Sequence, residues 1–94
     1  MLVLVVWFTV QPGKEERCRE IIRVMQEHTR KEPGCQEYVG SQSSENPRNF
    51  IFYEVYDDQA ALDAHRAAAY YKQYVAGELS AILESREREL FQPV

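Results

Sequence analysis

The chain has 94 residues and a formal net charge of −4, from 11 basic and 15 acidic side chains. Hydrophobic residues make up 45% and charged residues 28% of it, which is the composition of a folded protein and excludes an intrinsically disordered one. The length predicts one domain, residues 1–94. Neither sign of charge forms a long run, so the clustered basic footprint that nucleic-acid binding requires is missing.

The two cysteines do not predict a disulfide or a metal site. Cys18 falls within a helical pattern and Cys35 opens a strand, and there is no C-x-x-C pair or Cys/His cluster. We expect both to be small, buried or half-buried apolar residues in a reducing compartment.

The apolar start of the chain, residues 1–8, could be mistaken for a signal or membrane segment. It has no basic leader and no small-x-small cleavage site, and it is about half as long as a membrane-spanning helix. We therefore expect a cytoplasmic protein that does not bind membranes.

The first predicted element is a strand over residues 2–10, which Pro12-Gly13 ends. A strand with one wet face alternates apolar and polar residues. Here both alternate sets are largely apolar, so we expect this strand to be covered on both sides. The two sets are Leu2, Leu4, Val6, Phe8 and Val10, and Val3, Val5, Trp7 and Thr9.

The remaining elements follow from hydrophobic spacing and turn residues. An amphipathic helix is predicted from Lys14 to about Lys31, because apolar residues recur there at intervals of three and four. Two strands and a turn between them predict a hairpin. The predicted ranges are a strand at 35–43, a turn at 44–49, a strand at 50–56, a short helix after Asp57 or Asp58, a second helical run from about Tyr70, and an exposed strand at 86–91.

The predicted order is strand, helix, strand, strand, helix, strand, with the second helix broken or doubled. It indicates an α+β, ferredoxin-like βαββαβ fold, a four-stranded antiparallel sheet with helices on one face. Helices can cover only one side of such a sheet, and the other side also carries apolar residues. We therefore predict a homodimer in which two sheets pack face to face.

Two side chains are candidates for acid–base chemistry. His65 follows Leu62 on the inner face of the short helix, where an imidazole can act as a base near neutral pH; its alternative role is that of a hydrogen-bonded core residue. Glu54 shares a strand face with Phe50, Phe52 and Tyr56. A carboxyl group among aromatic rings either has a raised pKa or is paired, for example with an arginine.

Tyrosine is abundant, with six residues, and one tryptophan accompanies it. Such side chains suit a pocket for a planar, partly polar ligand, because each combines an apolar ring with a polar tip. We expect at least half of the tyrosines to fill core edges and the dimer interface instead. The candidates are Trp7, Tyr38, Tyr53, Tyr70, Tyr71 and Tyr74. The motifs of nucleotide-binding proteins, zinc proteases and serine hydrolases are absent.

The chain resembles the antibiotic biosynthesis monooxygenase family in a series of motifs between residues 32 and 65. They are Glu32-Pro33-Gly34-Cys35 followed by Tyr38, then Asn46-Pro47, Phe50, Tyr53-Glu54-x-Tyr56 and Ala61-Leu62-x-x-His65. Members of this family are dimeric α+β barrels. Tyr56 stands where the family usually has tryptophan. Tyr70 stands where many members carry a second histidine, which removes a group that a histidine-pair mechanism would need.

The resemblance implies an oxygenase that uses dioxygen, with no metal, haem or flavin cofactor, on a phenolic, quinol-type or polycyclic aromatic compound. It implies that His65 is the base or a hydrogen-bond partner of the substrate, and that Glu54 orients it or balances its charge. The residues expected to line a pocket between the sheet and the helices are Trp7, Tyr38, Tyr53 and Tyr70.

Two other functions stay open. One is an isomerase of a small phosphorylated carbonyl compound, for which Arg66 and Lys72 would supply positive charge near His65. The other is a non-catalytic, dimeric module that binds a small ligand, which a His65 side chain pointing to solvent would favour.

Overall fold

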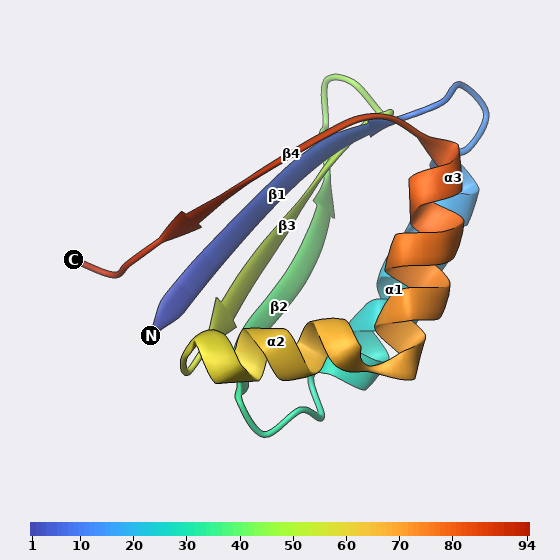
Figure 1. The fold of residues 1–94 in the computed structure, drawn as a ribbon. Coiled ribbons are helices and arrows are strands. Elements are labelled where there is room, and N and C mark those ends of the chain that lie inside the picture. The colour runs from blue at the N-terminus through green and yellow to red at the C-terminus, as the bar shows by residue number, and fades with distance from the viewer.

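The computed structural model describes all residues, 1–94. Its four strands form one antiparallel sheet in the order β2-β3-β1-β4 (Figure 1). The strands are β1 Leu2–Val10, β2 Cys35–Gln42, β3 Asn49–Tyr56 and β4 Leu83–Phe91. This is the predicted ferredoxin-like α+β arrangement.

The helices all lie on one side of the sheet (Figure 1). They are α1 Glu15–Thr29, α2 Gln59–Ala67, η1 Tyr71–Leu79 and α3 Ser80–Ile82. The second helical region is thus divided, as the sequence predicts, into α2 and a continuous run of η1 and α3. None of the helices is long and apolar enough to cross a membrane.

The helices begin and pack as their sequences dictate. Asp58 caps α2, because its side-chain oxygen accepts a hydrogen bond from the Ala61 N–H at 2.9 Å. The apolar stripe of α1 is fully or nearly fully buried against the sheet, which gives the fold its main core together with Phe8 and Phe50. The stripe consists of Cys18, Ile21, Ile22, Met25 and Thr29.

The run from Tyr71 to Leu79 is a π-helix, which the sequence does not predict. At its end the Ser80 N–H donates to the Val75 carbonyl, five residues earlier. A π-turn is wider than an α-turn and is found frequently at functional sites. Here it shapes one wall of the cavity described below.

The alternation along the strands separates two faces of the sheet. Phe8, Phe52 and Glu54 point toward the helices and are buried. Trp7, opposite Ile51 in the register, points to the other side, where it is 39% exposed. We call this uncovered side the open face. The expected coverage of β1 on both sides is therefore met on the helix side only, within one chain.

Strand β4 forms an edge of the sheet and pairs only with β1. It begins at Leu83, three residues earlier than predicted, and every residue after Leu83 is exposed. Its apolar end includes Leu90, 47% exposed, and Phe91, 43% exposed. No helix covers this strand on either side.

Candidate functional site

A small cavity lies between the helix-facing side of the sheet and η1, and we call it the inner cavity. Its volume is about 30 Å³, room for one or two water molecules. Its lining combines apolar side chains with five titratable or cationic ones beside two tyrosines. The lining residues are Leu4, Val6, Phe8, Tyr38, Phe52, Glu54, His65, Arg66, Tyr71, Val75, Leu79, Arg86 and Arg88.

His65 projects from α2 and is only 2% exposed. Its Nδ1 lies 2.9 Å from Oε2 of Glu32, which follows α1 in the chain. A neutral imidazole that donates its Nδ1–H to a carboxyl oxygen keeps Nε2 as an acceptor. Nε2 lies 3.9 Å from Oε1 of Glu54, beyond hydrogen-bond distance, so it is free to accept a proton from a bound molecule.

Burial lowers the pKa of His65 below its ordinary value of 6.5. The hydrogen bond to Glu32 opposes this effect, and the positive charge of Arg66 adds to it. The ring is therefore mostly neutral near pH 7, which is the protonation state that a base requires.

Glu54 is 4% exposed, and burial raises its pKa to about 7. The Tyr56 hydroxyl donates to its Oε1 at 2.5 Å, and this bond, like the charge of Arg66, partly lowers the pKa again. A carboxyl group that titrates near neutral pH can both give and take a proton.

Of the four aromatic residues predicted to line the pocket, Tyr38 lines the inner cavity and Tyr70 contacts a residue beside it. Tyr38 is 2% exposed and lies against the His65 ring, with centroids 5.6 Å apart. The Tyr70 hydroxyl donates to the same Glu32 oxygen that His65 contacts. Tyr70 thus lies behind Glu32 and does not line the inner cavity itself.

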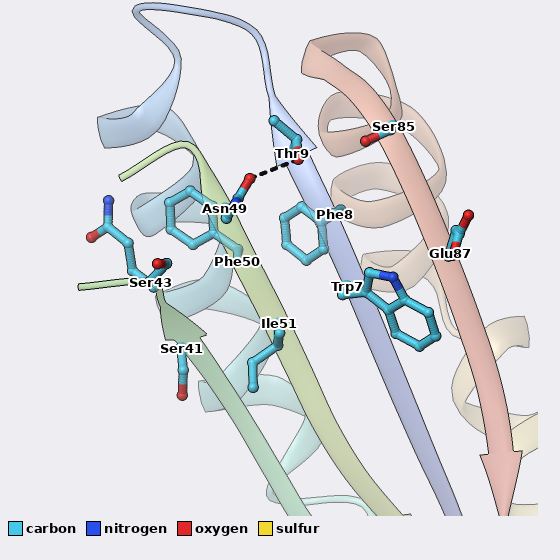
Figure 2. A pocket seen from close by; sticks show the side chains of 11 residues that line it. Trp7, Phe8, Thr9, Ser41, Ser43, Asn49, Phe50, Ile51, Ser85 and Glu87 are labelled. Carbon is cyan, nitrogen blue, oxygen red and sulfur yellow. Dashed lines mark hydrogen bonds between the residues drawn. The ribbon is translucent and has the colours of Figure 1, made fainter. Parts of the chain in front are cut away.

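Trp7 and Tyr53 lie elsewhere, which corrects their expected position between the sheet and the helices. Each is an odd-numbered neighbour of a helix-facing residue, so strand alternation places it on the open face, 39% and 43% exposed. Trp7 borders a separate hollow of about 490 Å³ there, with Ile51 and Glu87 on the neighbouring strands (Figure 2). That outer hollow is roomy but has Glu87 as its only titratable side chain.

Several residues of the inner site do not emerge from the sequence reasoning. Glu32, and not Glu54, makes the hydrogen bond that orients His65. It belongs to the Glu32-Pro33-Gly34-Cys35 motif that carries the family resemblance, but nothing in that motif indicates a contact with His65. Arg86 and Arg88 reach the cavity because they alternate with glutamates along β4. No three metal-binding side chains gather in the way that would hold a metal ion.

Sequence comparison assigns the chain to a known family. Residues 1–77 match the sequence model of the family described as antibiotic biosynthesis monooxygenase. The chain belongs to the antibiotic biosynthesis monooxygenase family. This chain is similar to the uncharacterized protein sll1783 of Synechocystis, to which it is 28% identical over 83 residues. That match covers 88% of this chain but spans only 56% of the relative's length.

Solved structures of similar chains agree with the family assignment. A crystal structure of an antibiotic biosynthesis monooxygenase is 27% identical, with a TM-score of 0.93 and coverage of 100% of this chain and 99% of the other. Protein SO0527 from Shewanella oneidensis is 30% identical, with a TM-score of 0.89 and coverage of 96% and 87%. PA3566 from Pseudomonas aeruginosa is 25% identical, with a TM-score of 0.91 and coverage of 99% and 93%. These matches show that the fold of this chain is shared by proteins similar to it in sequence.

Proposed function

We propose that this protein is a monooxygenase that needs no cofactor and acts on a phenolic, quinol-type or polycyclic aromatic compound, with His65 as the base. The observation that carries the proposal is the state of His65. It is buried, its Nδ1 is held by Glu32, and its pKa is lowered, so that Nε2 is an unoccupied acceptor inside a cavity. The family assignment supports the oxygenase chemistry.

The chemistry requires little more than a base and a dry site. Removal of a proton by Nε2 turns a phenol or an anthrone into an electron-rich anion that can itself reduce dioxygen. For an anthrone, the two C–H bonds of the reacting CH₂ group supply all four electrons. One oxygen atom becomes the new carbonyl, and the other leaves as water with both hydrogens. No external reductant enters the balance.

The size of the inner cavity sets a condition on this proposal. Since it holds one or two water molecules, an aromatic substrate has to push its wall outward or leave most of its ring at the mouth. The wall opposite the sheet is η1, through Tyr71, Val75 and Leu79. We propose that η1 shifts when the substrate binds.

The proposed assembly is a homodimer formed by the open face. Apolar side chains of moderate to high exposure gather there, and a second copy of the sheet would remove them from water. They include Trp7, Val39, Ile51 and Tyr53. In such a dimer the outer hollow would lie between the two sheets.

A second candidate function is the isomerisation of a small phosphorylated carbonyl compound. Three arginines line the inner cavity beside His65 and Glu54, which provides the positive charge that such a substrate needs. Proton transfer between carbons would use the same base. A His65 side chain that points to solvent would have favoured the non-catalytic alternative, whereas the ring is buried and hydrogen-bonded.

An oxygen-uptake screen tests the main proposal. We expect the metal-free protein to consume dioxygen with at least one member of a panel of quinols, anthrones and phenols. His65→Ala and His65→Gln should lower the rate by about 10²- to 10⁴-fold, the usual contribution of a general base. Glutamine keeps a donor for Glu32, so it controls for loss of packing. Uptake that is unchanged in both variants would refute the role of His65. Exchange of substrate hydrogen with deuterated solvent, without uptake, would favour the isomerase.

A further inference from the structure

Three of the arginines stand apart from the others. Arg66, Arg86 and Arg88 line the inner cavity, and the side chain of none of them makes a hydrogen bond or an ion pair within the chain. Every arginine away from this cavity has a side-chain hydrogen-bond partner. Those paired arginines are Arg17, Arg19, Arg23, Arg30 and Arg48. The guanidinium groups without a partner in the chain are therefore the three that line the inner cavity.

The sheet register explains how two of them come to be there. Arg88 pairs with Val6 and Arg86 with Phe8, which places both on the helix-facing side of β4. Glu87 lies opposite Trp7 and points to the open face. The strand therefore sorts its charges, with cations toward the cavity and anions away from it.

The acidic groups of the cavity do not neutralise these cations. Glu54 has no ion pair with an arginine, and burial raises its pKa to about 7, so that it is uncharged in much of the population at neutral pH. Arg66 lies close enough to lower the pKa of both Glu54 and His65. In a chain with a net charge of −4, the mouth of this cavity is a local concentration of positive charge.

We propose that Arg86 and Arg88, together with Arg66, bind an anionic oxygen group of the substrate, a carboxylate or a phosphate, and thereby hold its reactive atom at His65. A guanidinium fork matches both groups through paired N–H donors. The small volume of the inner cavity agrees with this arrangement. The anionic group of the substrate stays at the exposed arginines of β4, and only its reacting end enters the cavity. The inference rests on the proposed function in that the bound molecule is the substrate of the His65 site.

Two matched pairs of probes test the proposal by calorimetric titration under anaerobic conditions. The first pair is 1-hydroxy-2-naphthoate and 2-methyl-1-naphthol, and the second is dihydroxyacetone phosphate and dihydroxyacetone. Within each pair the molecules differ mainly in the anionic group, and the two pairs distinguish a carboxylate from a phosphate. The protein variants are Arg86→Ala, Arg88→Ala and Arg88→Lys. Arg23→Ala, which removes the same charge from the exposed face of α1, is the matched control.

We expect the anionic member of at least one pair to bind at least tenfold more tightly than its neutral counterpart. Arg86→Ala and Arg88→Ala should each weaken that binding by about tenfold, since charge-assisted hydrogen bonds are lost. Arg88→Lys should recover part of the loss and Arg23→Ala should have no effect. Raised salt should weaken the anionic ligand only. Melting curves verify that each variant is folded.

The proposal is overturned if neither anionic probe binds more tightly than its neutral counterpart, including the case in which none binds. It is also overturned if the preference survives both alanine variants. Its failure differs from failure of the proposed function. Oxygen uptake that depends on His65 but not on these arginines would refute only the anion site. Arginine-dependent binding without any turnover would refute only the monooxygenase.

Discussion

His65 and Glu32 are 33 positions apart in the chain, and their side chains meet at 2.9 Å. The contact joins α2 to the segment between α1 and β2. Because Glu32 accepts the Nδ1–H, the other ring nitrogen is left to accept a proton. The same Glu32 oxygen accepts the Tyr70 hydroxyl, which fixes the carboxyl group in turn. In the proposed mechanism Glu32 is a positioning residue, because its effect on the chemistry would pass through His65.

Glu32→Ala should lower kcat/KM by about tenfold to hundredfold, the usual effect of removing a group that orients a reactive side chain. It should also mix the two tautomers of His65, which a purely structural defect would not do. The ¹⁵N shifts of the imidazole report the tautomer directly. Glu37→Ala, an exposed carboxyl on β2, is the matched control. A His65 ring that keeps one tautomer and full activity without Glu32 would contradict this role.

Glu54→Gln should change how stability depends on pH. The pKa of Glu54 is raised from 4.5 to about 7 in the folded protein, so its contribution is fully present below pH 4.5 and is lost as pH rises through 7. Between these two pKa values the free energy of unfolding of the wild type should fall by about 3 kcal/mol, and that of the glutamine variant should not. Urea unfolding at pH 5 and pH 8 measures this. Parallel stability curves for the two proteins would contradict the raised pKa.

Comparing the wild type with Glu54→Gln separates the effect of Glu54 on stability from that of His65, whose pKa is shifted in the opposite direction. A lowered histidine pKa contributes stability above pH 6.5 that is lost as pH falls. The two groups therefore act in opposite directions where their pH ranges overlap, below pH 6.5. The wild-type curve alone would show only their difference.

Tyr56→Phe should raise the pKa of Glu54 above about 7, because the hydroxyl that donates to its Oε1 lowers that pKa. The buried carboxyl loses its donor, so stability at pH 8 should fall by about 1 to 3 kcal/mol. Tyr53→Phe removes a hydroxyl on the open face and should do neither. A ¹³C titration of the Glu54 carboxyl follows the change. Equal Glu54 pKa values in the two variants would contradict the hydrogen bond's role.

Hydrophobic periodicity is sufficient to predict the fold, because the apolar residues of the helices and strands in this chain recur at regular intervals. The α1 stripe of Cys18, Ile21 and Met25 is buried as its spacing predicts. The alternation of β3 likewise places Glu54 beside Phe52 on the helix-facing side. The sequence does not predict the π-helix, because its side-chain spacing over a few turns resembles that of an α-helix. Its wider turn depends on packing that a single sequence does not display.

The site was harder to predict, because it is made by contacts between distant segments. The sequence indicates His65 and Glu54, because each is a titratable residue on an otherwise apolar element. It does not indicate Glu32, since nothing local to Glu32 shows that α2 brings His65 to it. The expected pocket positions of Trp7 and Tyr53 rest on residue type and on the resemblance, although strand alternation places both on the face opposite Glu54.

Ile51→Arg should dissociate the proposed homodimer, because Ile51 is a 43% exposed apolar residue in the centre strand pair of the open face. A charge buried between two sheets would be strongly destabilising. Light scattering coupled to size-exclusion chromatography should give a dimer for the wild type and for Gln73→Arg, which adds the same charge on exposed η1. A monomeric wild type, or a dimer that tolerates Ile51→Arg, would contradict assembly through this face.

The central claim is that His65 removes a proton from the substrate, and anaerobic spectroscopy tests it without any oxygen chemistry. Anthrone and its enolate absorb at different wavelengths, so deprotonation is visible when the protein is mixed with anthrone in the absence of dioxygen. We predict that the wild type generates the enolate at a pH where His65 is neutral, and that His65→Gln does not. Equal enolate formation by both proteins, or a wild type that deprotonates no member of the panel of quinols, anthrones and phenols, would contradict the claim.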